Sequence, residues 1–319
     1  MFFTKMIIEN FKSIASAEID FAPFTILVGA NASGKSNLIN AFKFLSNIAT
    51  EGIENAVALQ GGIPYLTNMS LPKGSPIEIS FSLDISNEGW IRYTENKSFA
   101  LEVQKIDYHF MIQPNLKGGG YHIVEDELIL TFDCLHVDPS AKGKDRYTPL
   151  NAKYTFVAEK KTAKSNIQLR NTFDPLDVID EETRKSISEN ITHQVFARIC
   201  NEDKNELMLY RVSMLLPPVF SESTFIRIFD FDPKELKKAS SMASTKILEE
   251  NGSNLASVLH NILRTKENRD KLTTYLKSFL PFVNGISVEN NLDRSFSYKI
   301  QENFSNRAFH SNFLCKLSL

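Results

Sequence analysis

Cysteine is scarce in this sequence, and its three residues, Cys134, Cys200 and Cys315, are far apart. No Cys-x-x-Cys pair occurs and no histidine stands at ligand spacing, so neither a disulfide framework nor a zinc site is expected. An excess of basic charge is missing too, because 36 lysines and arginines face 38 aspartates and glutamates. Net charge therefore gives no reason to expect nucleic-acid binding, although it does not exclude a local basic patch.

Long apolar runs are also absent. No stretch approaches the ~18 consecutive apolar residues that suggest a membrane-spanning helix, and the N-terminal residues show no signal-peptide pattern. We therefore expect a cytoplasmic protein without a membrane segment. What the chain has is 319 residues, of which 42% are apolar and 23% charged. This composition is ordinary for a globular protein, and the length allows two domains.

The first 50 residues alternate between strand and helix patterns. Strands are expected at residues 7–8, 17–21 and 24–28, and the third is apolar enough to be buried on both faces. After a loop that contains glycine, apolar residues recur at helical spacing, namely Leu38, Ala41, Phe42, Leu45 and Ala49. The pattern therefore predicts strand, loop and helix in that order.

From residue 77 the apolar period changes to two. Residues 77–85 alternate cleanly between apolar and polar side chains, which predicts a half-buried strand. Residues 99–103 and 106–112 repeat the alternation in opposite phase, so a turn or bulge is expected near Gln104 and Lys105. A mixed β lobe is therefore expected after the first helix.

The rest of the chain is less regular. Short strands are expected at 128–132, 154–157 and 167–169, and a helix at 180–200, before Pro217 and Pro218 stop regular structure. A strand at 225–229 and a helix opened by Asp232 and Pro233 follow. Two amphipathic helices are then expected, after Gly252 and around 272–280, and finally a pair of strands at 286–288 and 296–300.

The strongest motif lies between the third expected strand and the first helix. Its pattern is G-x-x-x-x-G-K-[ST], matched by Gly29, Ala30, Asn31, Ala32, Ser33, Gly34, Lys35 and Ser36. The glycines allow successive N–H groups, with the positive end of the helix, to meet phosphate oxygens. Lys35 would reach the β- and γ-phosphates, and Ser36 would bind Mg²⁺. We predict ATP and Mg²⁺ as ligands; the alternative, a chance match, is disfavoured by the strand and helix around the loop.

Residues 6–14, MIIENFKSI, together with Asn37 directly after the motif, resemble the heads of SMC, RecF and OLD-like ATPases. Residues 58–62 and 249–259 look like two further stretches of stand-alone AAA-family ATPases with an ABC-type head, among them retron- and Septu-associated defence ATPases. The resemblance covers roughly residues 1–85 and 225–305. It implies an α/β fold, a three-layer P-loop NTPase head of ABC type with a mixed β lobe and an inserted subdomain. The expected divisions are 1–115 for the N-terminal part of the head, 116–220 for the insertion and 221–319 for an incomplete C-terminal part.

The same resemblance implies roles for residues outside the motif core. Asn37 would belong to the nucleotide-binding loop. Lys12 would approach the phosphates with Phe11 near the base, whereas the alternative is a solvated Lys12 and a core Phe11. Gln60 is a candidate second ligand of Mg²⁺ beside Ser36, although a plain surface glutamine suits its short spacing from the motif better.

The elements that would hydrolyse ATP are not visible in the sequence. The resemblance implies a signature motif near residue 310, a strand that ends in Asp-Glu and a later switch histidine, and none is found. We expect from this that the chain is truncated or changes reading frame. The pair Asp180 and Glu181 is explained better as a helix start, so no catalytic residue is assigned, and slow or no turnover by the chain alone is expected.

The function predicted from these features is that of an ATP-binding ABC-type ATPase. It would act as an ATP-switched homodimer that controls an effector in a DNA-linked or phage-defence (antiviral) system. Candidate partners are ATP, a second copy of the chain, an effector nuclease and DNA. Two other classes stay open. One is a truncated remnant without function, and the other is a small-molecule P-loop kinase, which is less favoured because no arginine-bearing lid is evident.

Overall fold

The computed structural model describes residues 1–86, 91–93, 99–161, 164–199, 205–215, 226–305 and 307–311. The chain divides into two compact units, Met1–Ile226 and Arg227–Leu319. Both combine helices with strands, which agrees with the predicted α/β class. Cys200, Cys315 and the last residues of the chain lie outside the described ranges.

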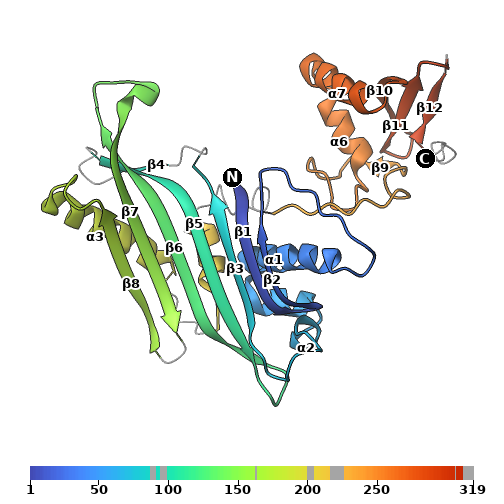
Figure 1. The fold of residues 1–319 in the computed structure, drawn as a ribbon. Coiled ribbons are helices and arrows are strands. Elements are labelled where there is room, and N and C mark those ends of the chain that lie inside the picture. Colours follow the sequence, from blue (N-terminus) through green and yellow to red (C-terminus); the bar gives the residue numbers. More distant parts are fainter. Residues whose placement is uncertain are drawn as a thin grey trace. The chain divides into compact units, whose positions relative to one another are not determined.

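A large antiparallel sheet dominates the first unit (Figure 1). Its eight strands follow the order β2-β1-β3-β5-β6-β7-β8, and β4 pairs with β5. The bounds are β1 Phe2–Phe11, β2 Ile14–Asp20, β3 Ile77–Asp84, β4 Ile91–Tyr93, β5 Phe99–Pro114, β6 Tyr121–Val137, β7 Tyr147–Lys161 and β8 Lys164–Asp174. A 3-10 turn, Gly143–Arg146, precedes β7.

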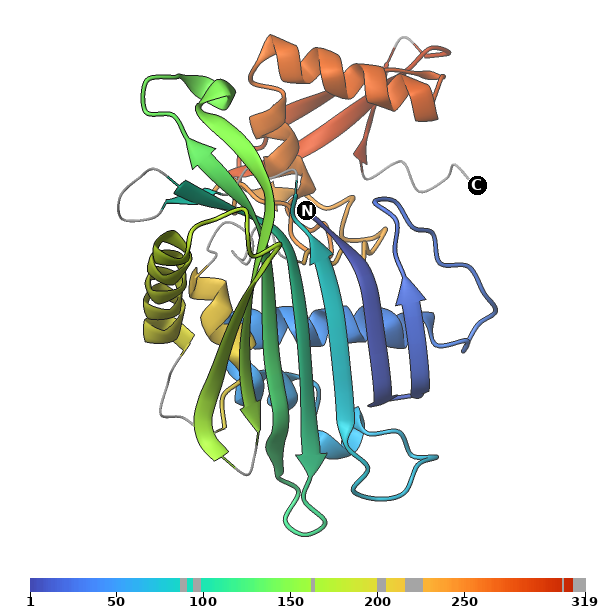
Figure 2. The same ribbon diagram turned by 60° about the vertical axis from the view of Figure 1, so that its left-hand side comes forward.

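One face of this sheet packs on helices. Side chains alternate across a strand, and β3 accordingly turns Ile77, Ile79 and Phe81 into the core while Glu78 and Ser80 stay partly exposed. The helices on the core side are α1 (Lys35–Leu59), α2 (Ile63–Leu66), α3 (Glu181–Ile199) and α4 (Met208–Leu215). Figures 1 and 2 show α1 crossing behind the strands. The described part of this unit therefore has two layers, sheet and helices, where three were expected.

The period-two expectations hold in this sheet. The register of β5 against β6 shifts between Val103 and Lys105, which confirms the bulge predicted from the change of phase. The short strands predicted between residues 128 and 169 lie within β6, β7 and β8, and the helix predicted at 180–200 is α3. Residues 116–220, expected as an inserted subdomain, thus supply three strands to the same sheet as β1 and β3.

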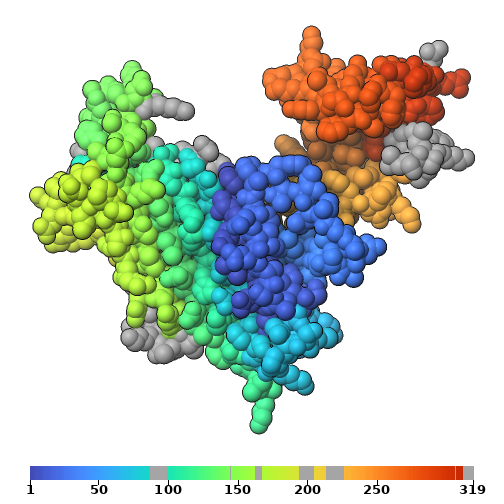
Figure 3. Space-filling model, viewed as in Figure 1, coloured from blue at the N-terminus to red at the C-terminus, as the bar shows by residue number. Residues whose placement is uncertain are grey.

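Residues 24–28 differ from expectation. They pair with no strand in the described part of the chain, and Phe24, Ile26 and Val28 are 81%, 69% and 86% exposed. In the view of Figure 3, the N-terminal part of the chain, in blue, forms part of the surface. The predicted burial is wrong here because a strand that is apolar on both faces needs partner strands and covering layers, whereas the edge of this sheet is β2.

The described part of the second unit holds two helices and a small sheet. Helices α6 (Leu255–Ile262) and α7 (Lys266–Phe279) confirm the two predicted amphipathic helices. The four strands are β9 Ser240–Ser241, β10 Val283–Asn290, β11 Ser295–Glu302 and β12 Ala308–His310, in the order β10-β11-β12 with β9 paired to β11. The predicted strand pair is β10 and β11, and its core includes Ala256, Leu259, Phe296 and Tyr298.

Two expectations near the start of the second unit are wrong. Residues 226–229 form no strand, and residues 233–237 form turns rather than the helix predicted at Asp232. The carbonyl of Asp232 accepts from the amide of Leu236 at 3.0 Å, but the pattern is not continued into further helical turns. Among the helices that the structure describes, none combines the length and the apolar character required to cross a membrane.

Candidate functional site

The loop of residues 29–36 is folded around the ammonium group of Lys35. Its Nζ donates to the carbonyl oxygens of Gly29 at 2.7 Å and Ala30 at 2.6 Å, and to Ser33 Oγ at 3.1 Å. The amide of Ser33 donates to the carbonyl of Ala30 at 3.3 Å, which closes a turn. A single lysine therefore holds both ends of the loop and fixes a positive charge within it.

Backbone conformation explains the glycine at position 34, and close approach of a side chain favours the one at position 29. Gly34 has a φ of 94° and Ala32 a φ of 63°, the left-handed region that side chains disfavour. A Cβ on Gly29 would come within 2.8 Å of Ser33 Oγ. Alternation of left-handed residues with others makes concave arrangements of amides that bind anions. The loop thus has the backbone geometry that suits a phosphate.

Several amides of the loop are free. In the part of the chain that the structure describes, the N–H groups of Ala32, Gly34, Lys35 and Ser36 donate no hydrogen bond. Helix α1 begins at Lys35, so the last two are first-turn amides, which no helix satisfies internally. Together with the positive end of the helix, they favour an anion. The loop is also exposed, so a ligand can reach it.

The turn between β1 and β2 borders the first turn of α1. Asn37 Nδ2 donates to Ser13 Oγ at 2.5 Å, and the amide of Lys12 donates to the carbonyl of Leu66 at 2.6 Å. Asn37, expected in the nucleotide loop, therefore anchors the helix to this turn. Partial burial lowers the pKa of Lys12, whose Nζ lies 5.9 Å from the Phe11 ring centroid.

Two further residues implied by the family resemblance can now be placed. Phe11 is fully buried and packs on Phe44 with ring centroids 5.8 Å apart, so it is a core residue and not a base-stacking one. Gln60 follows the last residue of α1, whereas Ser36 lies in its first turn.

The length of α1 separates Gln60 from Ser36. From Ser36 to a kink at Gly52 the helix rises roughly 24 Å, and the residues beyond the kink can return at most about 12 Å of that length. The structure therefore does not bring Gln60 and Ser36 together as ligands of one metal ion. Gln60 instead closes the helix, since its amide donates to the carbonyl of Val57 at 3.2 Å.

The acidic pair at 180–181 starts a helix, as expected. Asp180 Oδ1 accepts from the amide of Thr183 at 2.8 Å, and this hydrogen bond holds the pKa of Asp180 below its usual value. The carbonyl of Asp180 accepts from the amide of Arg184 at 3.0 Å. These contacts account for Asp180 as the cap of α3, where an acid favours the positive helix end.

A buried polar network behind the sheet was missed by the sequence reasoning. Tyr108 donates its hydroxyl proton to Asp126 Oδ1, and the other carboxyl oxygen accepts from the amide of Met208 at 2.8 Å. The amide of Leu209 donates to Tyr108 Oη at 3.0 Å. Complete burial raises the pKa of Asp126 to about 6 although these bonds oppose the rise. The network fixes the start of α4 to β5 and β6.

The neighbouring Glu206 connects this network to the helix of the phosphate loop. Gly52 interrupts α1 with a φ of 82°, and Glu206 Oε1 accepts from the amide of Ile53 just after the break, at 3.0 Å. The same oxygen accepts from the amide of Leu207 at 3.1 Å. A signal was available for Asp126, because it occupies an inward position of the alternating strand β6. None was available for Glu206, which is 153 residues from its partner.

The stretch 249–259, which resembles a family motif, forms the entry to α6. Asn254 is 2% exposed, and its Nδ2 donates to the carbonyls of Thr245 at 3.2 Å and Ile247 at 2.7 Å. Its Oδ1 accepts from the amide of Glu249 at 2.9 Å. Gly252, with a φ of 76°, packs so tightly that a Cβ would lie 2.3 Å from Leu236 Cδ2. These residues shape the loop before α6.

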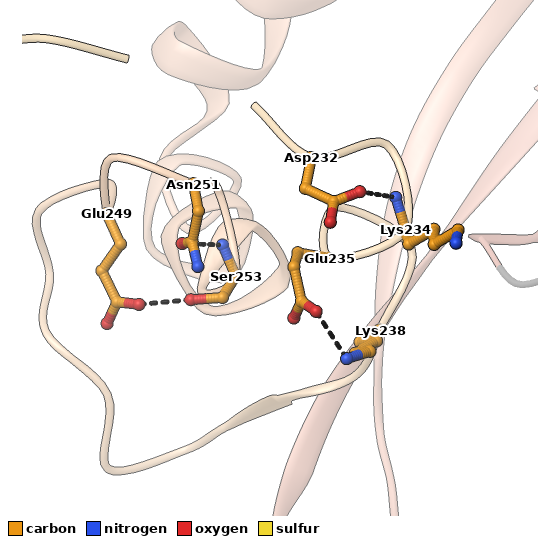
Figure 4. Close-up of polar contacts among 7 residues, drawn as sticks. All are labelled: Asp232, Lys234, Glu235, Lys238, Glu249, Asn251 and Ser253. Atoms are coloured by element: carbon orange, nitrogen blue, oxygen red, sulfur yellow. Dashed lines mark hydrogen bonds and ion pairs between the residues drawn. The ribbon is translucent and has the colours of Figure 1, made fainter. Parts of the chain in front are cut away.

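Figure 4 shows the polar contacts of the two turns that meet there. In one turn, Ser253 Oγ donates to the carboxylate of Glu249 and the Ser253 amide donates to Asn251 Oδ1 at 3.0 Å. In the other, Lys238 pairs with Glu235 at 2.6 Å, and the amide of Lys234 donates to Asp232 Oδ1 at 2.8 Å. Each contact lies within one turn, so the motif has a structural explanation in this unit.

Free amides at a helix start, a glycine-bearing loop and a lysine directed into it are the features of P-loop nucleotide-binding proteins. The chain belongs to the AAA ATPase domain family, whose model matches residues 1–312. Membership supports ATP binding and ATPase activity, usually with Mg²⁺. No curated protein matches the sequence closely.

Proposed function

We propose that residues 29–36 bind the phosphates of ATP and that Ser36 contributes its hydroxyl to the accompanying Mg²⁺. The observation that carries this proposal is the group of four free amides at Ala32, Gly34, Lys35 and Ser36. Lys35 supplies a positive charge among them, and its present partners are uncharged oxygens that a phosphate oxygen can replace. Ser36 is exposed in the first turn of α1, where its hydroxyl can face the solvent.

Calorimetric titration of the full chain with Mg-ATP tests this proposal. Lys35→Ala is expected to weaken binding roughly 10- to 100-fold, because a hydrogen bond to a charged group contributes about 1.5–3 kcal/mol. Lys43→Ala is the matched control, since Lys43 is an exposed lysine further along the same helix. Equal affinities of the wild type and the Lys35→Ala variant would rule out the loop as the nucleotide site.

We further propose that this chain by itself hydrolyses ATP slowly. Phosphoryl transfer needs a positioned water as well as charge at the γ-phosphate. The acidic pair that the sequence offered does not supply it, because Asp180 caps α3, and the buried Asp126 is bonded to Tyr108 and Met208. Steady turnover by this chain that disappears in Lys35→Ala would contradict the proposal.

The finer proposal is that ATP drives an ABC-type dimer of this chain. Two features support it: the phosphate loop is exposed, and the segment that precedes it presents Phe24, Ile26 and Val28 to solvent. Contact with a second copy would remove this apolar surface from water. Such a dimer would act as a switch for an effector, for example a nuclease, in a DNA-linked or phage-defence system.

Light scattering with and without Mg-ATP tests dimer formation. The expected result is a doubled mass with Mg-ATP for the wild type, and an unchanged monomer for Lys35→Ala. The same measurement on Ile26→Asp separates loss of the apolar contact from loss of nucleotide binding. A monomer under every condition, at protein concentrations where ATP is bound, would argue against the switch.

A further inference from the structure

The second unit contains a pocket of its own, with a volume of about 410 Å³. It lies where α6 ends, α7 begins and β10 passes. The lining residues are His260, Leu263, Arg264, Arg269, Ile286, Ser287 and Val288. All of them belong to the second unit, so the pocket is independent of the loop at residues 29–36.

The charge of this pocket is positive. Two arginines line it, and among the residues that the structure describes no acidic side chain does. Of the acids near these residues in the chain, Glu267 pairs with Lys271 at 2.7 Å and Glu289 pairs with Lys299, while Asp270, next to Arg269, is not part of the lining. The second unit as a whole carries 14 lysines and arginines against 10 aspartates and glutamates, although the chain has 36 against 38. The positive charge is therefore concentrated in this unit.

The two arginines differ in how they are held. Arg269 Nη2 donates to the carbonyl of Leu263 at 2.8 Å, which fixes its guanidinium at the end of α6. Arg264 makes no side-chain hydrogen bond or ion pair in the described part of the chain, and its side chain is exposed. A planar guanidinium offers five N–H donors, and two of them match a phosphate oxygen pair. Arg264 is thus free to bind an anion beside an arginine already in place.

The other lining residues indicate which kind of molecule carries the anionic group. Leu263, Ile286 and Val288 provide apolar surface, and the ring of His260 is stacked on Phe296 with centroids 4.1 Å apart. The N-terminus of α7 follows directly after Arg264. Thr265 caps this helix, since its side chain accepts from the amide of Asn268 at 3.4 Å. Apolar walls with a few polar groups are typical of sites for organic ligands.

We propose that this pocket binds a phosphate group carried by an organic ligand, with Arg264 and Arg269 as its anion contacts. The phosphate can belong to a small phosphorylated molecule or to a nucleic-acid strand. The exposed Arg264 contacts the phosphate from solvent, and Arg269 contacts it from its fixed position at the end of α6. The apolar residues contact the carbon portion next to the phosphate.

The test uses the full chain carrying Lys35→Ala, so that the loop at residues 29–36 does not compete for phosphate. Phenyl phosphate is titrated by calorimetry, and a short fluorescently labelled oligothymidylate by anisotropy. Arg264→Ala is expected to weaken whichever probe binds by roughly 10-fold or more. Arg264→Lys keeps the charge without the paired donors and is expected to give an intermediate loss. Arg307→Ala, an exposed arginine of the same unit outside the pocket lining, should change nothing.

Each outcome decides the proposal. If Arg264→Ala weakens only the binding of phenyl phosphate, the pocket binds small phosphorylated molecules. If it weakens the binding of the oligonucleotide, the pocket binds nucleic acid. Absence of binding by both probes, or binding that Arg264→Ala and Arg269→Ala leave unchanged, overturns it. Thermal melting of each variant confirms that the second unit stays folded, because Arg269 also contacts the end of α6. Mg-ATP affinity of Arg264→Ala in the otherwise wild-type chain should be unaffected, which separates this site from the nucleotide loop.

Discussion

At the scale of single residues, backbone conformation carries much of the proposed chemistry. Gly34 stands directly before α1 with a φ of 94°, and its own amide and that of Lys35 are free. A side chain at such an angle costs roughly 1–2 kcal/mol in backbone strain. The strain would relax by rotating the peptide groups that hold the amides in place.

Gly34→Ala is therefore expected to weaken Mg-ATP binding while the fold is retained. Gly118 provides a matched comparison, because it has a similar φ of 87° in the loop after β5 and no atom within 4 Å of an added Cβ. Gly118→Ala should cost similar stability in thermal melting but leave Mg-ATP affinity unchanged. An equal effect of both substitutions on affinity would show that the angle at Gly34 does not serve the ligand.

Titration of the Asp126 carboxyl group makes the stability of the chain depend on pH. Its pKa is raised to about 6 in the folded chain, compared with about 3.9 for a free aspartate. Between these values the native state binds more protons than the unfolded state. The free energy of unfolding should therefore fall as pH rises from about 4 to about 6, by up to about 3 kcal/mol, and change little from this group above that range.

Urea denaturation between pH 4 and pH 7 measures this dependence. Asp126→Asn removes the titrating group and keeps an oxygen that can accept from Tyr108, so the slope in this window should flatten. Other acids still titrate, and the difference between the two proteins isolates Asp126. Parallel curves for the wild type and the variant would assign the pH dependence to other groups.

At the scale of elements, features set by neighbouring residues could be predicted from the sequence, whereas features set by distant contacts could not. The strands β3 and β5 and the bulge after Val103 could be predicted because alternation is written in neighbouring residues. The exposure of residues 24–28 could not be predicted, because the burial of a strand depends on partner strands that the segment itself does not specify. The partners of Asp126 and Glu206 could not be predicted either, because they are 82 and 153 residues away, although the inward position of Asp126 in β6 was a signal of its burial.

The kink of α1 is the element-scale feature with the clearest test. Glu206 accepts from the first amide after the break, and a Cβ on Gly52 would lie 2.7 Å from its Oε2. Gly52→Ala and Glu206→Ala should each destabilise the chain by about 1–3 kcal/mol. Gly52→Ala adds a Cβ that clashes with Glu206 and strains a backbone with a φ of 82°, and Glu206→Ala removes the acceptor of the Ile53 amide. The double variant should cost less than the sum, because removing Glu206 removes the clash. Denaturant unfolding of all four proteins measures this coupling, and strict additivity would contradict the geometry.

At the scale of the whole molecule, the chain is divided into two units with separate cores. The candidate sites follow this division, with the phosphate loop in the first unit and the arginine-lined pocket in the second. The sequence suggested where the phosphate loop lies because the motif is continuous. It gave no sign of the pocket, whose walls come from two helices and a strand that are joined only by folding.

Separate cores predict separate unfolding. Asn254 is the buried amide that organises the entry to α6, and Asn254→Ala leaves two carbonyls and one amide without their partner. We expect a loss of about 2–3 kcal/mol in the second unit. Calorimetric melting should show the transition of that unit shifted to lower temperature while the transition of the first unit stays in place. The exposed Asn284→Ala is the control, and a shift of both transitions together would indicate one cooperative unit.

The break at Gly52 has a mechanical consequence for the first unit. A continuous helix would behave as one rigid rod, whereas two helical segments joined at a glycine can pivot about a single pair of torsion angles. The front segment begins at the phosphate loop, and Glu206 connects the rear segment to the buried network of Tyr108 and Asp126 behind the sheet. Displacement of the front segment on nucleotide arrival would then be absorbed at this joint, and the sheet would stay still.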